Sequence, residues 1–479
     1  MPRTSDRPHH NVTFAVLLVG IVAYSLLQSL VVPVLPTLME HLQTSQSTAT
    51  WLMTANLLSA SVATPILGRI GDKVGKERML AVTLTALTAG SALAGASHSI
   101  GLMIVARVIQ GFGGAVVPLA FGIIRDEFPA AKVRGAVGAA AALTAVGAGL
   151  GLVVAGPIVD HLDYHWLFWL PMALTALATI ATHLFVPESP VRTSGRINWG
   201  AAALLSAWLV TLLLAVSEGS EWGWASKRIL ALFAAAVVLA GYWIRVELRS
   251  DAPLIDMRMM RIPAVWTTNL VALLFGVGMY TTMTFLPQLV QTPQKFAGYG
   301  FSASVTQSGF YMLPMTIGMF ALGVLASPLA ARFGSKHVLI GGSAITVAPF
   351  VLLAISHDHA WQIYTASALV GVGLGLAFSA MSAIVVEAVP PSQTGAASGM
   401  NANIRTIGGA IGSAVAASIL SSGITATHPF PKDSGYTGTF WFLTVTALLA
   451  AAAAFTIPTA RRTRRLQAVG KPRHAASHR

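Results

Sequence analysis

Residues 11–39 read NVTFAVLLVGIVAYSLLQSLVVPVLPTLM and contain no Lys, Arg, Asp or Glu. Such charged residues make up only 10% of the 479 positions. Further uncharged runs of similar length cover residues 41–68, 79–106, 262–294, 296–331 and 434–460. A helix needs about 20 apolar residues to cross a bilayer core, and it satisfies its own backbone polar groups there. The sequence therefore predicts an all-α membrane protein that crosses the bilayer many times.

The number of spans and the distribution of basic residues predict the orientation of the chain. Fourteen spans are predicted, at residues 13–38, 48–68, 79–97, 101–124, 135–158, 166–186, 197–217, 228–246, 263–289, 303–331, 336–356, 361–388, 394–421 and 437–459. An even number places both termini on one side. If that side is the cytoplasm, all but six of the 30 Lys and Arg residues lie in cytoplasmic segments. This asymmetry is the positive-inside rule, so both termini are predicted to be cytoplasmic.

Composition also narrows the possible partners and cofactors. The net charge of +13 is concentrated in cytoplasmic segments, which argues against nucleic acid and favours contact with membrane lipids. Four arginines after the last span, Arg461, Arg462, Arg464 and Arg465, are predicted to bind anionic lipid. There is no cysteine, and we find no catalytic constellation, dense metal-ligand spacing or nucleotide-binding motif. We therefore expect no enzyme activity, no cofactor and no metal.

Two parts of the chain repeat each other at an offset of about 260 residues. Phe128-Pro129 and Arg134-Gly135 correspond to Val389-Pro390 and Thr394-Gly395. Two sets of six helices with two helices inserted between them account for fourteen spans. The predicted parts are residues 1–190, the inserted helices in 191–250, the second bundle in 251–460 and the tail 461–479. Parallel repeats of this kind place a substrate site near the midplane between the halves.

Four groups of residues resemble a known family. They are Gly68–Arg78, Arg107–Gly114, Glu221–Trp224 with Ala252–Met257, and Gly395–Gly409. With them the chain resembles the fourteen-helix drug:proton antiporter family of the major facilitator superfamily over nearly its whole length. The resemblance implies two six-helix bundles plus two central helices, in the bacterial plasma membrane. It implies export of a small amphipathic compound by alternating access, driven by protons, and we expect a monomer.

The resemblance assigns a gating role to the stretch from Gly68 to Arg78. We expect a glycine-rich loop whose Gly68 and Gly75 allow a tight reversal. Asp72 is expected to accept hydrogen bonds from a neighbouring helix N-terminus or an arginine, with Arg78 closing the motif. In the family this loop holds the two halves together on the cytoplasmic side. A solvated turn is the alternative.

The fifth predicted span resembles the family's antiporter motif in part. Gly151 and Gly156 fit that motif, whereas Leu152 stands where a proline is usual and Ala155 replaces a glycine. Small residues at this spacing also let helices pack closely in lipid. Gly151 and Gly156 are therefore candidates for a gating helix, and generic packing explains part of the same pattern.

Polar residues inside the predicted spans are the candidates for a substrate cavity. Arg107, with Gln110 one turn later, is costly in a bilayer unless it faces polar partners, and by resemblance it takes part in proton coupling. Arg405 lies on a small-residue helix with Asn401 and Asn403. A structural role for Arg107 and a packing role for the asparagines are the alternatives. Three more residues complete the expected cavity: Tyr24, Gln28 and Tyr280.

The spans lack the acidic residue that the family usually carries. Alignment on Leu35-Pro36 places Leu27 where the first span usually has an aspartate. Proton coupling needs a group that titrates, so Glu387, Asp160 or His183 at membrane edges must supply it, with Glu387 the first choice. The deep charges are positive, which favours a neutral or anionic substrate. A proton-coupled nutrient symporter and a non-pumping lipid-handling or sensor protein remain the alternative functions.

Overall fold

The computed structural model describes residues 10–44, 46–188, 198–250, 253–390, 393–421 and 430–458, and within them every regular element is helical. Fourteen helical spans in these segments are long and apolar enough to cross a membrane, and one of them, Ile100–Glu127, is a continuous stretch of two helices joined by a 3-10 turn. The predicted all-α fold with fourteen spans is confirmed. The predicted division near residues 190 and 460 and the basic tail lie outside the described residues, so the fold says nothing of them.

The helices follow one another in three groups. The first group is α1 (His10–Leu30), α2 (Leu35–His41), α3 (Gln46–Val74), α4 (Lys76–Gly95), α5 (Ile100–Gly111), the 3-10 turn η1 (Phe112–Ala115), α6 (Val116–Glu127), α7 (Ala130–His161) and α8 (Trp166–Phe185). The inserted helices are α9 (Trp199–Trp222) and α10 (Lys227–Arg249). The last group is α11 (Met257–Met260), α12 (Pro263–Gln291), α13 (Gln294–Ala297), α14 (Val305–Phe333), α15 (Ser335–Ile355), α16 (Ala360–Ala388), α17 (Thr394–Ser421) and α18 (Asp433–Thr456).

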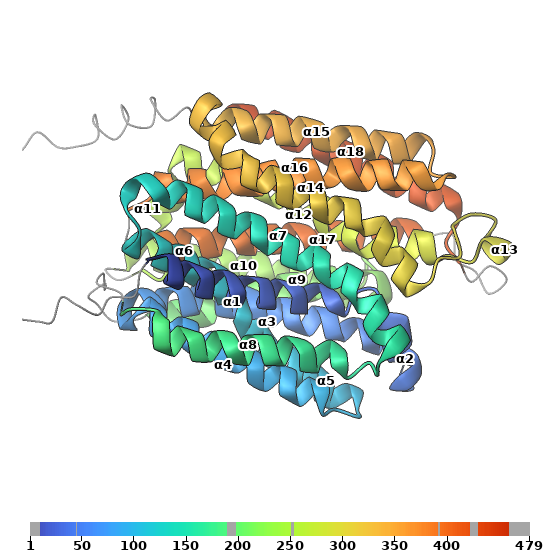
Figure 1. Cartoon of the computed structure of the whole chain (residues 1–479), viewed down its shortest axis with the longest axis horizontal. Helices are drawn as coiled ribbons and strands as arrows, with labels where there is room; N and C mark the ends of the chain where they lie inside the picture. Colours follow the sequence, from blue (N-terminus) through green and yellow to red (C-terminus); the bar gives the residue numbers. More distant parts are fainter. Residues whose placement is uncertain are drawn as a thin grey trace, which may run out of the picture.

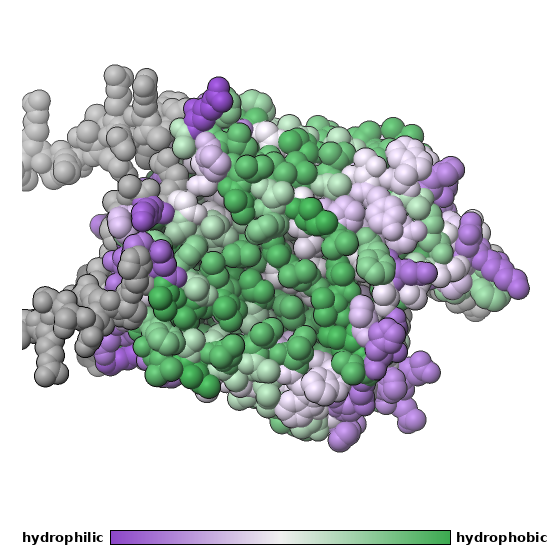
Figure 2. Space-filling model, in the orientation of Figure 1, coloured by the Kyte–Doolittle hydropathy of each residue, from purple (hydrophilic) through white to green (hydrophobic). Residues whose placement is uncertain are grey.

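The long helices run side by side along one direction, which makes two opposite ends of the molecule (Figure 1). We name the end where α1 begins and α18 ends the terminal face, and the end that carries α2 and α13 the opposite face. Apolar side chains cover the middle of the surface, and hydrophilic ones gather at both ends (Figure 2). This is the pattern of a protein whose apolar belt lies in lipid and whose two faces meet water.

Buried apolar side chains form two separate cores. One is built from α1 to α8, with Leu17, Leu84 and Ile124 among its members. The other is built from the last group of helices and includes residues of α9 and α10. The inserted helix α9 contacts both α3 and α17, so it spans the seam between the two halves.

Local sequence explains where several helices begin and break. The side chains of Ser99, Asn198, Ser226 and Ser304 cap helix N-termini by accepting a backbone N–H. The span predicted at 13–38 is wrong at its end, because α1 stops at Leu30 and α2 starts anew with a proline in its first turn. Proline has no N–H and is tolerated in that first turn but not further along.

Candidate functional site

The motif between α3 and α4 is a sharp corner and not the glycine-rich loop that we expected. α3 continues to Val74 and α4 begins at Lys76, so Gly68 and Asp72 are helical. Only Gly75 makes the reversal, with φ of 127°, which glycine adopts without strain. The prediction made the loop too long because it assigned all the glycines to a turn, whereas Gly68 lies in a helix and allows close packing. A Cβ at Gly68 would lie 3.7 Å from the Gly395 carbonyl oxygen on α17.

Asp72 lies in a buried charge cluster where α3 meets α17. Lys76 Nζ lies 3.6 Å from Asp72 Oδ1 and 2.7 Å from Asp126 Oδ2, and all three side chains are at most 2% exposed. The Asp72 carboxylate faces the first turn of α17, since a Cβ at Gly395 would lie 3.4 Å from Asp72 Oδ1. The positive end of the α17 dipole and the Lys76 ammonium both stabilise this negative charge.

Arg125 joins the two halves at the terminal face. It lies near the end of α6, and its guanidinium donates to the Val386 carbonyl at 2.5 Å and the Val389 carbonyl at 2.8 Å. It also donates to the Thr394 hydroxyl. The two carbonyls belong to the end of α16, and the hydroxyl belongs to the start of α17. One cation therefore holds α6 against two helices of the second half.

Arg78 lies apart from this connection. Its Nη2 lies 2.7 Å from Glu188 Oε1, and the two side chains are 54% and 66% exposed. Arg78 lies in the first turn of α4 and Glu188 follows α8, so the pair lies within the first half and does not bridge the halves. The structure brings Gly68 and Asp72 to the seam between halves and leaves Arg78 on the surface of the first half.

The glycines of α7 let it pack between α1 and α14. A Cβ at Gly151 would meet Ser29 and the Leu26 carbonyl of α1. A Cβ at Gly156 would overlap the backbone of Thr306 on α14. Gly151 therefore packs against α1 of the same half, whereas Gly156 packs against α14 at the seam between the halves. Close approach of this kind is the usual reason for small residues in membrane helices.

Arg107 is fully buried and bonded to protein groups. Its Nε donates to the Leu52 carbonyl at 2.9 Å, and its Nη1 donates to Gln110 Oε1 at 2.9 Å. Gln110 Nε2 in turn donates to Ser91 Oγ at 3.2 Å. These bonds tie α5 to α3 and α4, which is the structural role that the sequence left open. A role of Arg107 in coupling stays a prediction.

A polar group from α1 and α3 lies beside it. Gln28 Nε2 donates to the Tyr24 hydroxyl at 3.1 Å, and Asn56 Nδ2 donates to Gln28 Oε1. Tyr24 interacts electrostatically with both Arg107 and Arg405. The hydroxyl of Tyr24 thus lies within reach of the fields of two guanidinium groups, one from each half.

Arg405 is half-buried on α17. Its Cζ lies 4.9 Å from the centroid of the Phe378 ring, a cation–π contact, and Phe378 packs edge-on against Phe275. Arg405 also interacts electrostatically with Tyr280 and Tyr24. Among the described residues, neither Arg405 nor Arg107 is in an ion pair with a carboxylate. The structure therefore groups Tyr24, Tyr280 and two unneutralised cations near the junction of the halves.

The two asparagines of α17 make packing contacts. Asn401 Nδ2 donates to Asn269 Oδ1 at 2.8 Å, which ties α17 to α12. Asn403 Nδ2 donates to the Ser61 carbonyl at 2.6 Å, which ties α17 to α3 across the seam. Both side chains are buried. Their hydrogen bonds thus fit the packing alternative, and a part in substrate binding stays a prediction.

The two candidate acids lie at opposite ends of the seam. Glu387 is exposed near the end of α16, one residue from a carbonyl that Arg125 binds, and it interacts electrostatically with that arginine. Asp160 lies near the end of α7 at the opposite face and accepts a hydrogen bond from the Thr306 hydroxyl of α14. His183 lies near the end of α8 and is exposed.

Sequence reasoning missed several residues that build the site. Arg125 and Asp126 follow an uncharged run, and their position at a helix end resembles any solvated charge. Lys76 lies within the motif, but the sequence alone indicates no partner for it. Asn56 and Ser61 carry no signal in the sequence, because one polar residue in a span matters only through the helix that it faces.

The sequence of this chain is similar to those of known membrane transporters. The family model described as Major Facilitator Superfamily matches residues 17–320 and 268–478. The chain belongs to the major facilitator superfamily. It is 30% identical over 387 residues to the Multidrug transporter protein MdtP of Bacillus subtilis, covering 78% of this chain and 69% of that protein. It is 30% identical over 373 residues to Multidrug resistance protein 3 of the same organism, covering 76% and 70%.

A solved structure of the superfamily has the same fold. The crystal structure of the human organic anion transporter MFSD10 (TETRAN) superposes with a TM-score of 0.69 at 16% identity, and the match covers 94% of this chain and 100% of that one. At this identity the likeness concerns the fold alone. This major facilitator protein is a multi-pass membrane transporter and not an enzyme, and proteins similar to it are named multidrug transporters.

Proposed function

We propose that this transporter exports small amphipathic compounds, neutral or anionic, by alternating access coupled to protons. We place it in the plasma membrane of a bacterium as a monomer, with the terminal face in the cytoplasm. The names of the B. subtilis relatives support the substrate class in its broad form. The charge of the substrate rests on one observation, the cationic centre described next.

The cationic centre consists of Arg107 and Arg405, one from each half, with Tyr24 and Tyr280 in their fields. A cation entering between them would be repelled, and among the described residues neither guanidinium is in an ion pair with a carboxylate that could attract the cation instead. An anion gains Coulomb energy from both guanidinium groups in a medium of low dielectric constant. The Phe378 ring, backed edge-on by Phe275, supplies an apolar surface beside Arg405.

Alternating access needs contacts that form on one face and break on the other. At the terminal face, Arg125 bonds α16 and α17 and the Asp72 carboxylate faces the start of α17, so this conformation would be closed to the cytoplasm. The contact of Gly156 with Thr306 lies toward the opposite face. We propose that the halves rock about the close packing of α7 on α14, and that the Arg125 contacts open when the cavity faces inward.

Of the candidate acids, Asp160 is the better placed proton carrier. It belongs to the first half and accepts a hydrogen bond from Thr306 of the second half, so a proton on Asp160 would act directly on the contact between the halves. Glu387 and Asp160 are both exposed, so the hydrogen bond between the halves, and not burial, favours Asp160. Asp160→Asn should uncouple transport from the pH gradient, whereas Glu387→Gln should leave coupling intact.

Transport by purified protein in proteoliposomes tests the proposal. A pH gradient is imposed, and uptake of an anionic dye is compared with uptake of ethidium. Proton-driven flux of the anionic dye toward the acidic side supports export. Flux of ethidium alone contradicts the substrate class, flux in the direction of the protons indicates a symporter, and no flux of either compound contradicts active transport.

The charge argument has a matched pair of variants. Arg405→Gln removes a cation from the proposed cavity and should raise KM for the anionic dye about tenfold, the effect of a loss of about 1.4 kcal/mol. Arg332→Gln removes an arginine that also stacks on a phenylalanine, at 5.3 Å from Phe333, but at the surface end of α14. It should leave KM unchanged, and equal effects of the two variants would contradict a direct role of Arg405.

A further inference from the structure

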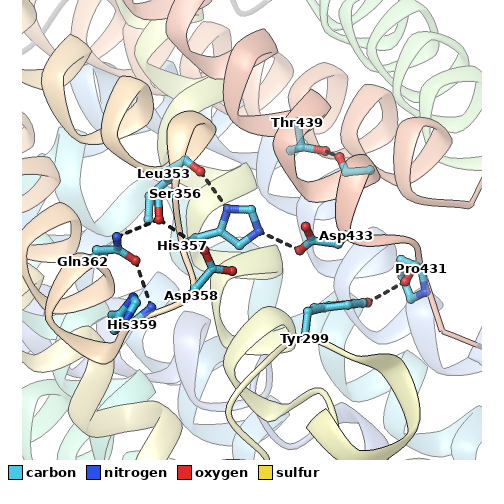
Figure 3. Close-up of polar contacts among 11 residues, drawn as sticks. Tyr299, Leu353, Ser356, His357, Asp358, His359, Gln362, Pro431, Asp433 and Thr439 are labelled. Carbon is cyan, nitrogen blue, oxygen red and sulfur yellow. Dashed lines mark hydrogen bonds and ion pairs between the residues drawn. The ribbon is translucent and has the colours of Figure 1, made fainter.

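His357 lies outside the cavity, on the opposite face, where it connects two helices of the second half. Its side chain is on the short segment between α15 and α16, and the residue is 7% exposed. The ring Nδ1 lies 2.8 Å from the Leu353 carbonyl oxygen in the last turn of α15. The ring Nε2 lies 2.9 Å from Oδ1 of Asp433, the first residue of α18. Figure 3 shows the ring directed between these two partners.

The two partners determine which protonation state lets both ring nitrogens form hydrogen bonds. The Leu353 carbonyl can only accept, so a bond there needs a proton on Nδ1. A bond between Nε2 and the Asp433 oxygen needs one further proton, either on the ring or on the carboxyl group. A neutral ring protonated at Nδ1 would instead direct a lone pair at an ionised carboxylate. Hydrogen bonds at both nitrogens therefore require one dissociable proton in the pair.

The helix ends favour placing that proton on the ring. The carbonyl of Leu353 belongs to the C-terminal turn of α15, where the helix dipole stabilises a positive charge. Asp433 begins α18, where the dipole stabilises a negative charge. Both helices thus favour an imidazolium ion bonded to a carboxylate. The pair therefore places a positive charge at a helix C-terminus and a negative charge at a helix N-terminus, which are the favourable signs at both.

We propose that His357 and Asp433 form a proton-binding site that ties the start of α18 to the end of α15. When the proton leaves, two acceptors face each other at 2.9 Å and the connection opens. When the proton binds, the connection closes. If the termini are cytoplasmic, the opposite face is external and the site responds to the pH of the external medium. This response to external pH rests on the proposed function.

The surroundings of the ring contain few competing groups. Phe440 of α18 packs edge-on against the ring, and the Tyr299 hydroxyl donates to the Pro431 carbonyl just before α18 at 2.6 Å. Burial raises the pKa of Tyr299, so that hydroxyl remains a donor at neutral pH. The other titratable or charged side chains near the ring in sequence are Asp358 and His359, which follow it, and Lys432 and Tyr436, which flank Asp433. Asp358 accepts from the Ser356 hydroxyl at 3.3 Å and not from the ring.

Nuclear magnetic resonance of the full-length protein in lipid nanodiscs, labelled with ¹⁵N-histidine, tests the site directly. Ring nitrogen shifts are recorded from about pH 5 to about pH 9, which brackets the usual range of histidine titration. His357→Gln assigns the signal by its disappearance. We expect both ring nitrogens to carry protons at low pH, and the ring to lose its proton at a lower pH in Asp433→Asn than in the wild type. Titration at the same pH in both proteins, or a ring that is neutral throughout, overturns the proposal.

A second measurement uses a variant that keeps the connection without the proton. The amide of His357→Gln can donate to Asp433 at any pH, so its melting temperature should lose the pH dependence that the connection gives the wild type, roughly 2 °C over this range. His337→Gln is the matched control, because that exposed histidine also places Nδ1 2.8 Å from the carbonyl four residues earlier. Equal pH dependence of melting in all three proteins overturns the proposal. A normal titration of His357 without proton-driven transport would contradict the proposed function and leave the proton site intact.

Discussion

The connection made by Arg125 gives the sharpest prediction about how this transporter opens. Arg125→Ala removes the guanidinium that bonds Val386, Val389 and Thr394 of the second half. Each hydrogen bond of this type contributes about 1 kcal/mol net, and bonds of a charged donor contribute more. The closed state should therefore lose about 3 kcal/mol relative to a state open at the terminal face. A shift of that size multiplies the ratio of open to closed molecules by about 150.

The absence of native cysteine makes this shift measurable without interference. Ser398 lies one turn after the Arg125 contacts on α17 and is 8% exposed, so a cysteine in its place should be protected while the terminal face is closed. The assay is the rate of labelling of Ser398→Cys by a membrane-impermeant maleimide added at the terminal face. Arg125→Ala should raise that rate by about 30-fold or more, up to the limit set by a fully open state.

The control for this experiment is Arg78→Ala. Arg78 is another arginine of the first half, but its partner Glu188 belongs to the same half and both are exposed. Exposed ion pairs contribute about 0–1 kcal/mol, so labelling of Ser398→Cys should stay within about threefold of the unmodified rate. If Arg125→Ala also leaves the rate within threefold while its melting temperature is normal, the connection does not hold the face closed.

Three further predictions follow from the contacts of the seam and the cavity. Asp72→Asn keeps the shape of the side chain but removes its attraction to Lys76 and the α17 N-terminus, so maleimide labelling of Ser398→Cys should rise about tenfold; an unchanged rate would contradict a gating role. Gly156→Leu should lower transport at least about tenfold because its side chain overlaps the α14 backbone. Gly101→Ala, at a position open to solvent or lipid, should transport normally, and equal activity of the two variants would show that close packing of α7 on α14 is not needed for transport. Tyr24→Phe removes a hydroxyl near two guanidinium groups and should change KM for an anionic dye by about fivefold with little change in melting temperature; a large loss of stability instead would assign Tyr24 to packing.

The sequence predicted the spans because the bilayer imposes a local rule. Each span must be about 20 residues long, apolar and free of charge, and each of these properties is visible in the chain itself. The same holds for the motif residues Asp72 and Gly156, whose types and spacing indicated contacts between helices. The sequence could not say which helix each would contact, because that depends on residues hundreds of positions away.

Tertiary structure alone decided which charges have partners. The sequence presented Arg107 and Arg405 as equivalent buried arginines, yet one bonds a backbone carbonyl and a glutamine while the other stacks on Phe378. It presented Arg125 and His357 as ordinary residues at helix ends, and the fold placed helix termini opposite both. Lipid selects side chains by polarity, so composition fixes how often this chain crosses the membrane. Hydrogen bonds require contact within about 3 Å, so only the packing of distant helices determines what each polar side chain can do.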